Sequence, residues 1–113
     1  MSGFYVGMSG PGAAIAHEVP NPVNRATGAT VPIMSAVSKT LTVTYRFRDG
    51  SALVVTSWTF AALTADSVRA LYIPSAGDFP AEGQMTVETQ LVLDGVTYQF
   101  TDERDVVADR PRR

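Results

Sequence analysis

The fold is decided by the stretch Lys39-Thr40-Leu41-Thr42-Val43-Thr44-Tyr45-Arg46-Phe47-Arg48-Asp49-Gly50-Ser51. From Leu41 to Phe47, large apolar side chains alternate with threonine and arginine. A period of two is typical of a β-strand with one buried face. Asp49-Gly50 then predicts a two-residue type I′ hairpin turn. The stretch therefore predicts a strand, a tight turn and a second strand antiparallel to the first.

The same pattern returns later in the chain. Met85 to Leu93 alternates apolar and polar side chains, Asp94-Gly95 predicts a second tight turn, and Val96 to Phe100 alternates again. Two hairpins with alternating strands on both sides predict an all-β fold.

Three other segments are strand candidates: Ala13 to Val19, Ser51 to Phe60 and Ser67 to Ile73. The second is apolar on both faces, so we expect it either to be a central strand covered on both sides or to change face at a bulge. Trp58 within it is expected in the core. Between Ala61 and Leu71 the apolar spacing also allows a short helix.

The chain has 113 residues and a mass of 12.1 kDa, the size of one domain. Six or seven strands in this length need two sheets or a barrel to bury their apolar faces, and an immunoglobulin-like antiparallel β-sandwich fits best. We expect a Gly/Pro-rich N-terminal arm over residues 1–12, the sandwich over 13–103 and a short charged C-terminal tail over 104–113. Prolines predict a long loop or an edge crossing at residues 20–30.

The N-terminal segment combines dense glycine with large apolar side chains. Either it packs on its own domain, or it is an arm that binds a neighbouring subunit. In the second case Phe4, Tyr5 and Met8 are the expected partner-binding residues, because aromatic anchors carry much of the energy of an interface.

Charge and cysteine content argue against several functions. Nine basic and eleven acidic residues give a net charge of −2, whereas a protein that neutralises nucleic-acid phosphates is expected to be basic. The absence of cysteine removes disulfides, thiolate zinc sites and thiol catalysis. No targeting segment is recognisable, and the most apolar run, Ala52 to Leu63, is too short to span a bilayer.

The sequence predicts no catalytic, cofactor-binding or metal site, and no enzyme. His17 is the lone histidine, and a surface or edge-strand role is favoured over a general base or a metal ligand. Gly7-x-x-Gly10-x-Gly12 lacks the helix that a phosphate-binding loop needs after it. The acids after Thr101 are interrupted by arginines, which favours a solvated tail over a calcium site; they are Asp102, Glu103, Asp105 and Asp109.

Aromatic side chains fall mostly on the predicted inward faces. They are therefore expected to fill the core, and a platform for sugars or bases is the alternative; they are Tyr45, Phe47, Trp58, Tyr72, Phe79, Tyr98 and Phe100.

One order of strands and turns in the sequence is more specific than that of a general all-β domain. An alternating strand ends at Asp49-Gly50, Gly83 opens a long strand, and Asp94-Gly95 leads to a final strand. Over residues 30–101 this order resembles the immunoglobulin-like domain of tailed-phage structural proteins, as in the N-terminal domain of phage baseplate upper proteins.

The resemblance implies a virion structural protein of the head, neck, tail or baseplate, made in the host cytoplasm. Its partners would be other virion proteins and copies of itself. No cofactor, nucleic acid, membrane or small-molecule substrate is expected. A β-sandwich that binds carbohydrates or the host surface, like an adhesin, is the alternative.

Overall fold

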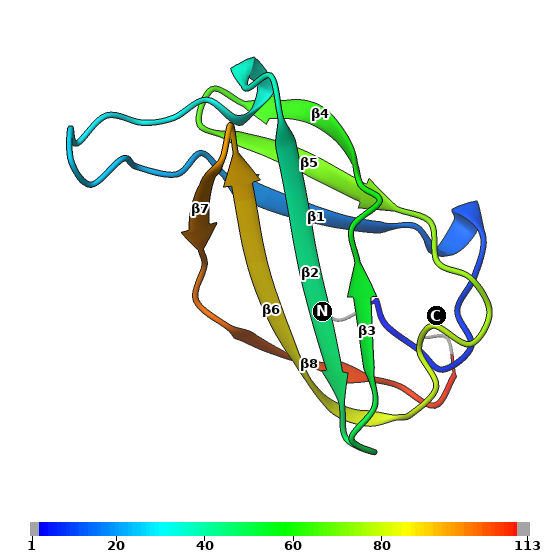
Figure 1. Cartoon of the computed structure of the whole chain (residues 1–113). Coiled ribbons are helices and arrows are strands. Elements are labelled where there is room, and N and C mark those ends of the chain that lie inside the picture. Colours follow the sequence, from blue (N-terminus) through cyan, green and yellow to red (C-terminus); the bar gives the residue numbers. More distant parts are fainter. Residues whose placement is uncertain (1–2, 111–113) are drawn as a thin grey trace.

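Two antiparallel β-sheets pack face to face in this computed structural model, which describes residues 3–110 (Figure 1). The smaller sheet has the order β1-β5-β4, and the larger has the order β3-β2-β6-β7, with β8 also pairing with β6. The strands are β1 (Ile15–Pro20), β2 (Lys39–Phe47), β3 (Ala52–Val55), β4 (Thr59–Thr64), β5 (Ser67–Tyr72), β6 (Gly83–Leu93), β7 (Val96–Gln99) and β8 (Glu103–Val107). The predicted all-β sandwich is confirmed.

Helical structure in residues 3–110 amounts to two short 3-10 turns, η1 (Pro11–Ala13) and η2 (Ile33–Ser35). No helix in this part of the chain is long and apolar enough to cross a membrane. The short helix that the spacing allowed between Ala61 and Leu71 is absent, because β4 and β5 form a hairpin there.

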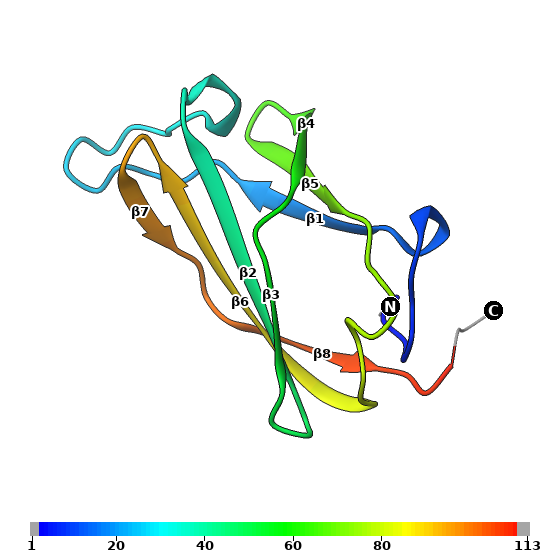
Figure 2. The ribbon, with the colours of Figure 1, turned by 45° about the vertical axis from the view of Figure 1, so that its right-hand side comes forward.

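The core lies between the sheets, which cross at an angle (Figure 2). Its centre is aromatic: Tyr45 on β2 and Phe79 in the loop before β6 are fully buried. Their rings meet edge to face with centroids 5.3 Å apart, and Phe47 meets Phe79 at 5.6 Å. Aromatic pairs prefer such tilted contacts because the edge of one ring is attracted to the face of the other.

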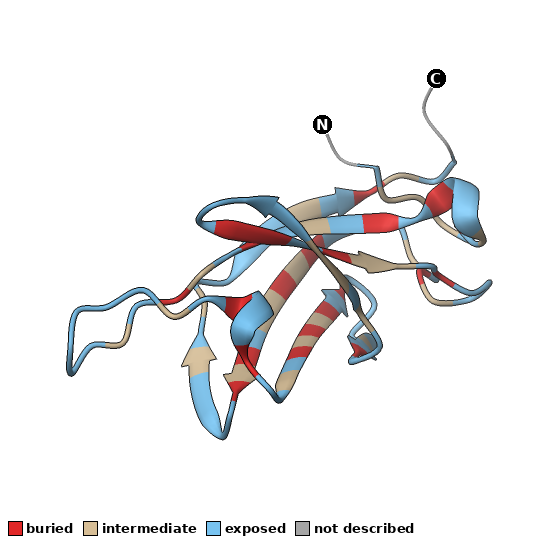
Figure 3. Cartoon of the chain, turned by 90° about the horizontal axis from the view of Figure 1, so that it is seen from above, coloured by how far each residue is buried: buried red, intermediate tan, exposed pale blue. Residues whose placement is uncertain are grey.

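The alternation that predicted β2 is also its burial pattern. Leu41, Val43, Tyr45 and Phe47 are buried, and the residues between them face outward. Buried and partly exposed residues also alternate along β6, as Figure 3 shows. The two strands pair over their whole facing length, from Lys39 opposite Leu93 to Phe47 opposite Met85.

The two Asp-Gly turns differ. Asp94 and Gly95 both have positive φ, 48° and 86°, as the predicted type I′ turn requires. At the first turn Gly50 alone has positive φ, 90°, and its N–H donates to the carbonyl of Phe47. That is a longer loop, a turn over Arg48 and Asp49 that ends in a left-handed glycine, so the type I′ prediction is wrong there.

The predicted strand from Ser51 to Phe60 is in fact two strands in different sheets. β3 lies at one edge of the larger sheet and β4 at one edge of the smaller, so neither is central. The chain crosses between the sheets at residues 56–58, which explains why the segment is apolar on both faces. Trp58 lies in this crossing and is half-buried, with its indole Nε1 donating to the carbonyl of Val55 at 3.0 Å.

Part of the expected charged tail is a strand. β8 pairs with the first half of β6, from Glu103 opposite Val87 to Val107 opposite Gly83. β7 pairs with the second half, where Gln99 lies opposite Gln90. Three residues, 100–102, therefore face two residues of β6, which makes a bulge between β7 and β8.

Candidate functional site

The expected N-terminal arm is tied to the domain over its described part. Met8 is 2% exposed, and the ring of Phe4 lies 5.3 Å from that of Phe79 and 5.8 Å from that of Tyr45. Tyr5 pairs in parallel with Ala108, just beyond β8. The three residues expected to bind a partner therefore pack on their own domain, which is the other alternative left open by the sequence.

His17 occupies an inward position of β1, between Ile15 and Val19. Its Nε2 lies 2.7 Å from the hydroxyl oxygen of Tyr45 on β2, and which atom donates depends on the imidazole tautomer. The imidazole stacks on the Tyr45 ring at 6.0 Å and meets the Trp58 ring edge-on at 5.5 Å. The histidine therefore lies on an edge strand, one of the two positions that the sequence favoured, but it is a partly buried link between the sheets and not a surface residue.

The bulge turns two acidic residues toward this histidine. Beyond it the odd-numbered residues of β8 share the inner face of the sheet: Glu103 and Asp105 lie opposite the buried Val87 and Met85. His17 and Glu103 both line a cleft of about 250 Å³ between β1 and the β7–β8 link. They also line, with Asp105, a cleft of about 460 Å³ beside the N-terminal segment.

Burial dominates the electrostatics of this polar cleft. It lowers the pKa of His17 from the ordinary value of 6.5, while the negative charges of Glu103 and Asp105 act in the opposite direction. Burial also raises the pKa of Tyr45, and Tyr72 and Asp105 add to that effect. Both partners of the inter-sheet hydrogen bond are therefore favoured in their neutral forms. Within residues 3–110, no three histidine or acidic side chains are grouped so that they could hold a metal ion.

The other aromatic residues divide between the core and its margin. Trp58 and Tyr72 are half-buried and in ring contact at 5.7 Å. The Tyr72 hydroxyl donates to Asp78 at 2.6 Å, and burial followed by this bond raises the pKa of Tyr72 to about 12. Tyr98 and Phe100 are also half-buried, but they line a second surface feature.

That feature is a groove of about 760 Å³ between β7 and a loop that projects from the sandwich (Figure 1). The loop covers residues 21–31, close to the loop predicted at residues 20–30, and is held by the bridge from Val23 to Thr30. Val23 and Val96 line the groove and are 53% and 51% exposed. One edge of β7 pairs with β6, and no strand among residues 3–110 pairs with the other.

The sequence missed the polar cleft for a definite reason. The sequence predicts a solvated tail for Glu103 and Asp105, because no apolar alternation accompanies them. The available signal was Val106-Val107, a short β-branched pair after the charges.

Comparison with family models, with curated proteins and with solved structures gave no match for this chain.

Proposed function

We propose that this chain is a structural module of a tailed-phage virion, with an immunoglobulin-like fold, that works through protein–protein contacts. The strand order supports the fold. In immunoglobulin-type sandwiches, the strands that follow one another as B, C, C′, D, E, F and G form the sheets B-E-D and C′-C-F-G. The orders β1-β5-β4 and β3-β2-β6-β7 correspond to these when β1 stands for B and β7 with β8 stands for G.

The N-terminal segment fits the same scheme. Tyr5 bridges Ala108 in parallel, and the N–H of Ala108 donates to the carbonyl of Phe4 at 3.0 Å. A first strand of such a domain lies at the open edge of the sandwich, where it can run parallel to the last strand. The resemblance of residues 30–101 to phage domains rests on the strand that ends at Asp49-Gly50, the long strand that Gly83 opens and the turn at Asp94-Gly95.

The observation that carries the function is the open edge of β7 beside the projecting loop. An unpaired strand edge offers backbone N–H and C=O groups that an extended segment can satisfy by adding a strand. Val23 and Val96 provide apolar walls on the two sides. We therefore assign the groove to an extended segment of a neighbouring virion protein.

The experiment is to delete the gene from the phage, supply the protein in trans and count its copies per purified particle by mass spectrometry. The parent chain is expected in stoichiometric amounts. Val23→Asp and Val96→Asp place a charge at the groove and are expected to lower incorporation. Val37→Asp is the matched control, because Val37 is 96% exposed and does not line the groove.

Particles that lack the chain altogether would overturn the proposal. Equal incorporation of all three variants would keep the virion role and move the contact away from β7. Circular dichroism on each variant separates loss of contact from loss of folding.

A further inference from the structure

A basic cleft lies on the outer face of the larger sheet, away from the groove beside β7. Its volume is about 750 Å³, and its lining contains Arg46, Arg48 and Arg104 but no aspartate or glutamate. Three of the nine basic residues thus gather in one cleft of a chain whose net charge is −2. The local charge of the cleft is therefore positive, although the net charge of the chain is negative.

The register of the sheet explains how two of these arginines meet. Arg46 on β2 lies opposite Thr86 on β6, and Thr86 lies opposite Arg104 on β8. All three point to the outer face, since Phe47, Met85 and Asp105 beside them point inward. Neighbouring strands are about 4.8 Å apart, so the two arginine backbones stand roughly 10 Å apart. Both side chains can therefore reach a group above Thr86.

Arg48 is placed at the rim by a glycine. Gly83 has a φ of +113°, and a Cβ built there would lie 2.7 Å from Cδ of Arg48. The aliphatic part of Arg48 therefore lies directly over the start of β6, in space that any other residue would fill. This close packing limits the positions of the guanidinium.

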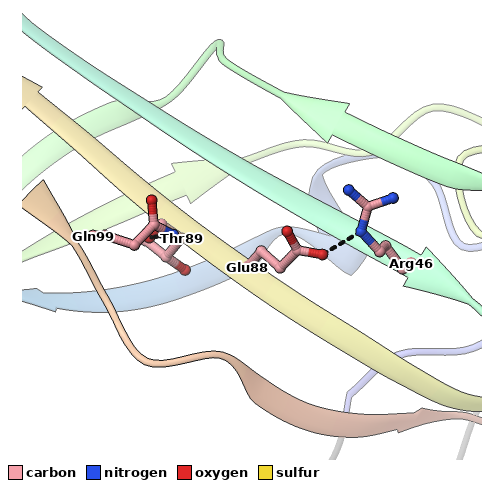
Figure 4. Close-up of polar contacts among 4 residues, drawn as sticks. All are labelled: Arg46, Glu88, Thr89 and Gln99. Carbon is pink, nitrogen blue, oxygen red and sulfur yellow. Dashed lines mark hydrogen bonds and ion pairs between the residues drawn. The ribbon is translucent and has the colours of Figure 1, made fainter. Parts of the chain in front are cut away.

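Most of the positive charge in the cleft is uncompensated. Arg46 forms an ion pair through Nε with Oε2 of Glu88, and its two Nη atoms point away from that carboxylate (Figure 4). Neither Arg48 nor Arg104 forms an ion pair within residues 3–110. Arg48 also lines a neighbouring cleft, whose lining contains Glu82, Asp109 and Arg110. One arginine of the three is thus paired with a carboxylate, and that carboxylate lies outside the cleft lining; the other two guanidinium charges are unpaired within residues 3–110.

We propose that this cleft binds a phosphate group in its dianionic form, as a monoester or as inorganic phosphate. A dianion matches the two uncompensated guanidinium charges, whereas a carboxylate or a phosphodiester supplies a single negative charge. Guanidinium groups form paired N–H···O bonds with phosphate oxygens, and the Thr86 hydroxyl adds a donor between them. The bound anion also relieves the repulsion between like charges across the strands.

The test is an NMR titration of the ¹⁵N-labelled protein at constant ionic strength. Inorganic phosphate and glycerol phosphate represent the free and the ester-bound source, and dimethyl phosphate and acetate are the monoanionic controls. The expected result is saturable shifts at residues 83–86 and 104–106, with dianions binding about tenfold more tightly than monoanions. Tighter binding of glycerol phosphate than of inorganic phosphate identifies an ester as the ligand, and equal binding identifies free phosphate.

Two variants and a control locate the site. Arg104→Gln and Arg48→Gln are each expected to weaken phosphate binding about tenfold. Arg69→Gln, at an exposed position of β5 in the other sheet, is expected to leave it unchanged. If Arg48→Gln disturbs the packing over Gly83 and lowers the unfolding temperature, the phosphate affinity of Arg104→Gln alone is the test of the site.

Three results would overturn the proposal. One is the absence of saturable shifts with either dianion. Another is equal weakening by Arg69→Gln and Arg104→Gln, which would indicate general charge screening. The third is tighter binding of a short oligonucleotide than of glycerol phosphate, which would indicate a surface for phosphodiester chains.

Discussion

His17 and Tyr45 join the two sheets by a side-chain hydrogen bond 2.7 Å long, with their rings stacked. The bond spans 28 positions of sequence and connects β1, an edge strand, to β2 in the middle of the other sheet. This hydrogen bond therefore fastens an edge strand of one sheet to a central strand of the other.

Acid is expected to weaken the fold through His17. The pKa of His17 is lowered in the folded protein, so between that value and the unfolded value of 6.5 the unfolded chain binds more protons. The free energy of unfolding should therefore fall as pH drops below 6.5 and level off below the folded pKa. Urea unfolding at a series of pH values measures this, and His17→Gln should remove that part of the slope.

The placement of Glu103 can be checked by the same titration. Its carboxylate favours the imidazolium form, so Glu103→Gln should lower the pKa of His17 further. Glu18→Gln is the matched control, because Glu18 is an exposed neighbour of His17 in sequence whose charge is not among the causes of the shifted His17 pKa. The Hε1 resonance of the imidazole reports the pKa, and a rise in the Glu103 variant would contradict the inward position of that residue.

Tyr45→Phe tests the hydrogen bond itself. The substitution keeps the buried ring and leaves Nε2 of a partly buried histidine without its partner. We expect a loss of about 1–3 kcal/mol in the free energy of unfolding. Tyr98→Phe removes a hydroxyl from a half-exposed tyrosine and should cost no more than about 0.5 kcal/mol. Equal effects in urea unfolding would rule out a special contribution from Tyr45.

Gly83→Ala should destabilise the protein more than Gly50→Ala. Both glycines have positive φ, for which alanine pays about 1–2 kcal/mol. A Cβ at Gly50 enters open space, whereas one at Gly83 collides with Arg48. In a double-mutant cycle, Arg48→Ala should recover the additional loss, because it removes the colliding Cδ. Additive effects of the two substitutions would show that no such collision occurs.

Met8→Ala tests whether the N-terminal segment belongs to the core. Met8 is 2% exposed, and truncating a buried methionine costs about 2–5 kcal/mol. Met34→Ala, at a residue that is 45% exposed, is the matched control and should have a much smaller effect. Thermal unfolding measures both, and near-neutral results for Met8→Ala would return the segment to the role of a free arm.

The sequence predicts strands correctly where apolar and polar residues alternate and where a short turn joins the strand to the next one in the chain. β2, β6 and β7 follow directly from their alternation and from two Asp-Gly turns. It failed at residues 51–60, because a segment that is apolar on both faces fits a covered central strand as well as a crossing between sheets. The choice depends on how the second sheet packs, which no local pattern contains.

The polar cleft was hidden for a related reason. Which face Glu103 presents depends on the register of β8 against β6, and the bulge at residues 100–102 changes that register by one. Without the bulge, Arg104 and Val106 would face inward and the acids would face solvent. Charge composition suggested a tail because it carries no information about this shift.

The bulge between β7 and β8 has a consequence for how this chain can vary over evolution. A substitution at residues 100–102 changes only the side chain at that position. Insertion or deletion of one residue there would shift the register of β8 against β6 by one, so the inward-facing and outward-facing residues of β8 would change places. Arginine would then take the inward-facing positions of β8, and the carboxylates of Glu103 and Asp105 would turn outward. The number of residues in this short link should therefore be under far stronger selection than their identities.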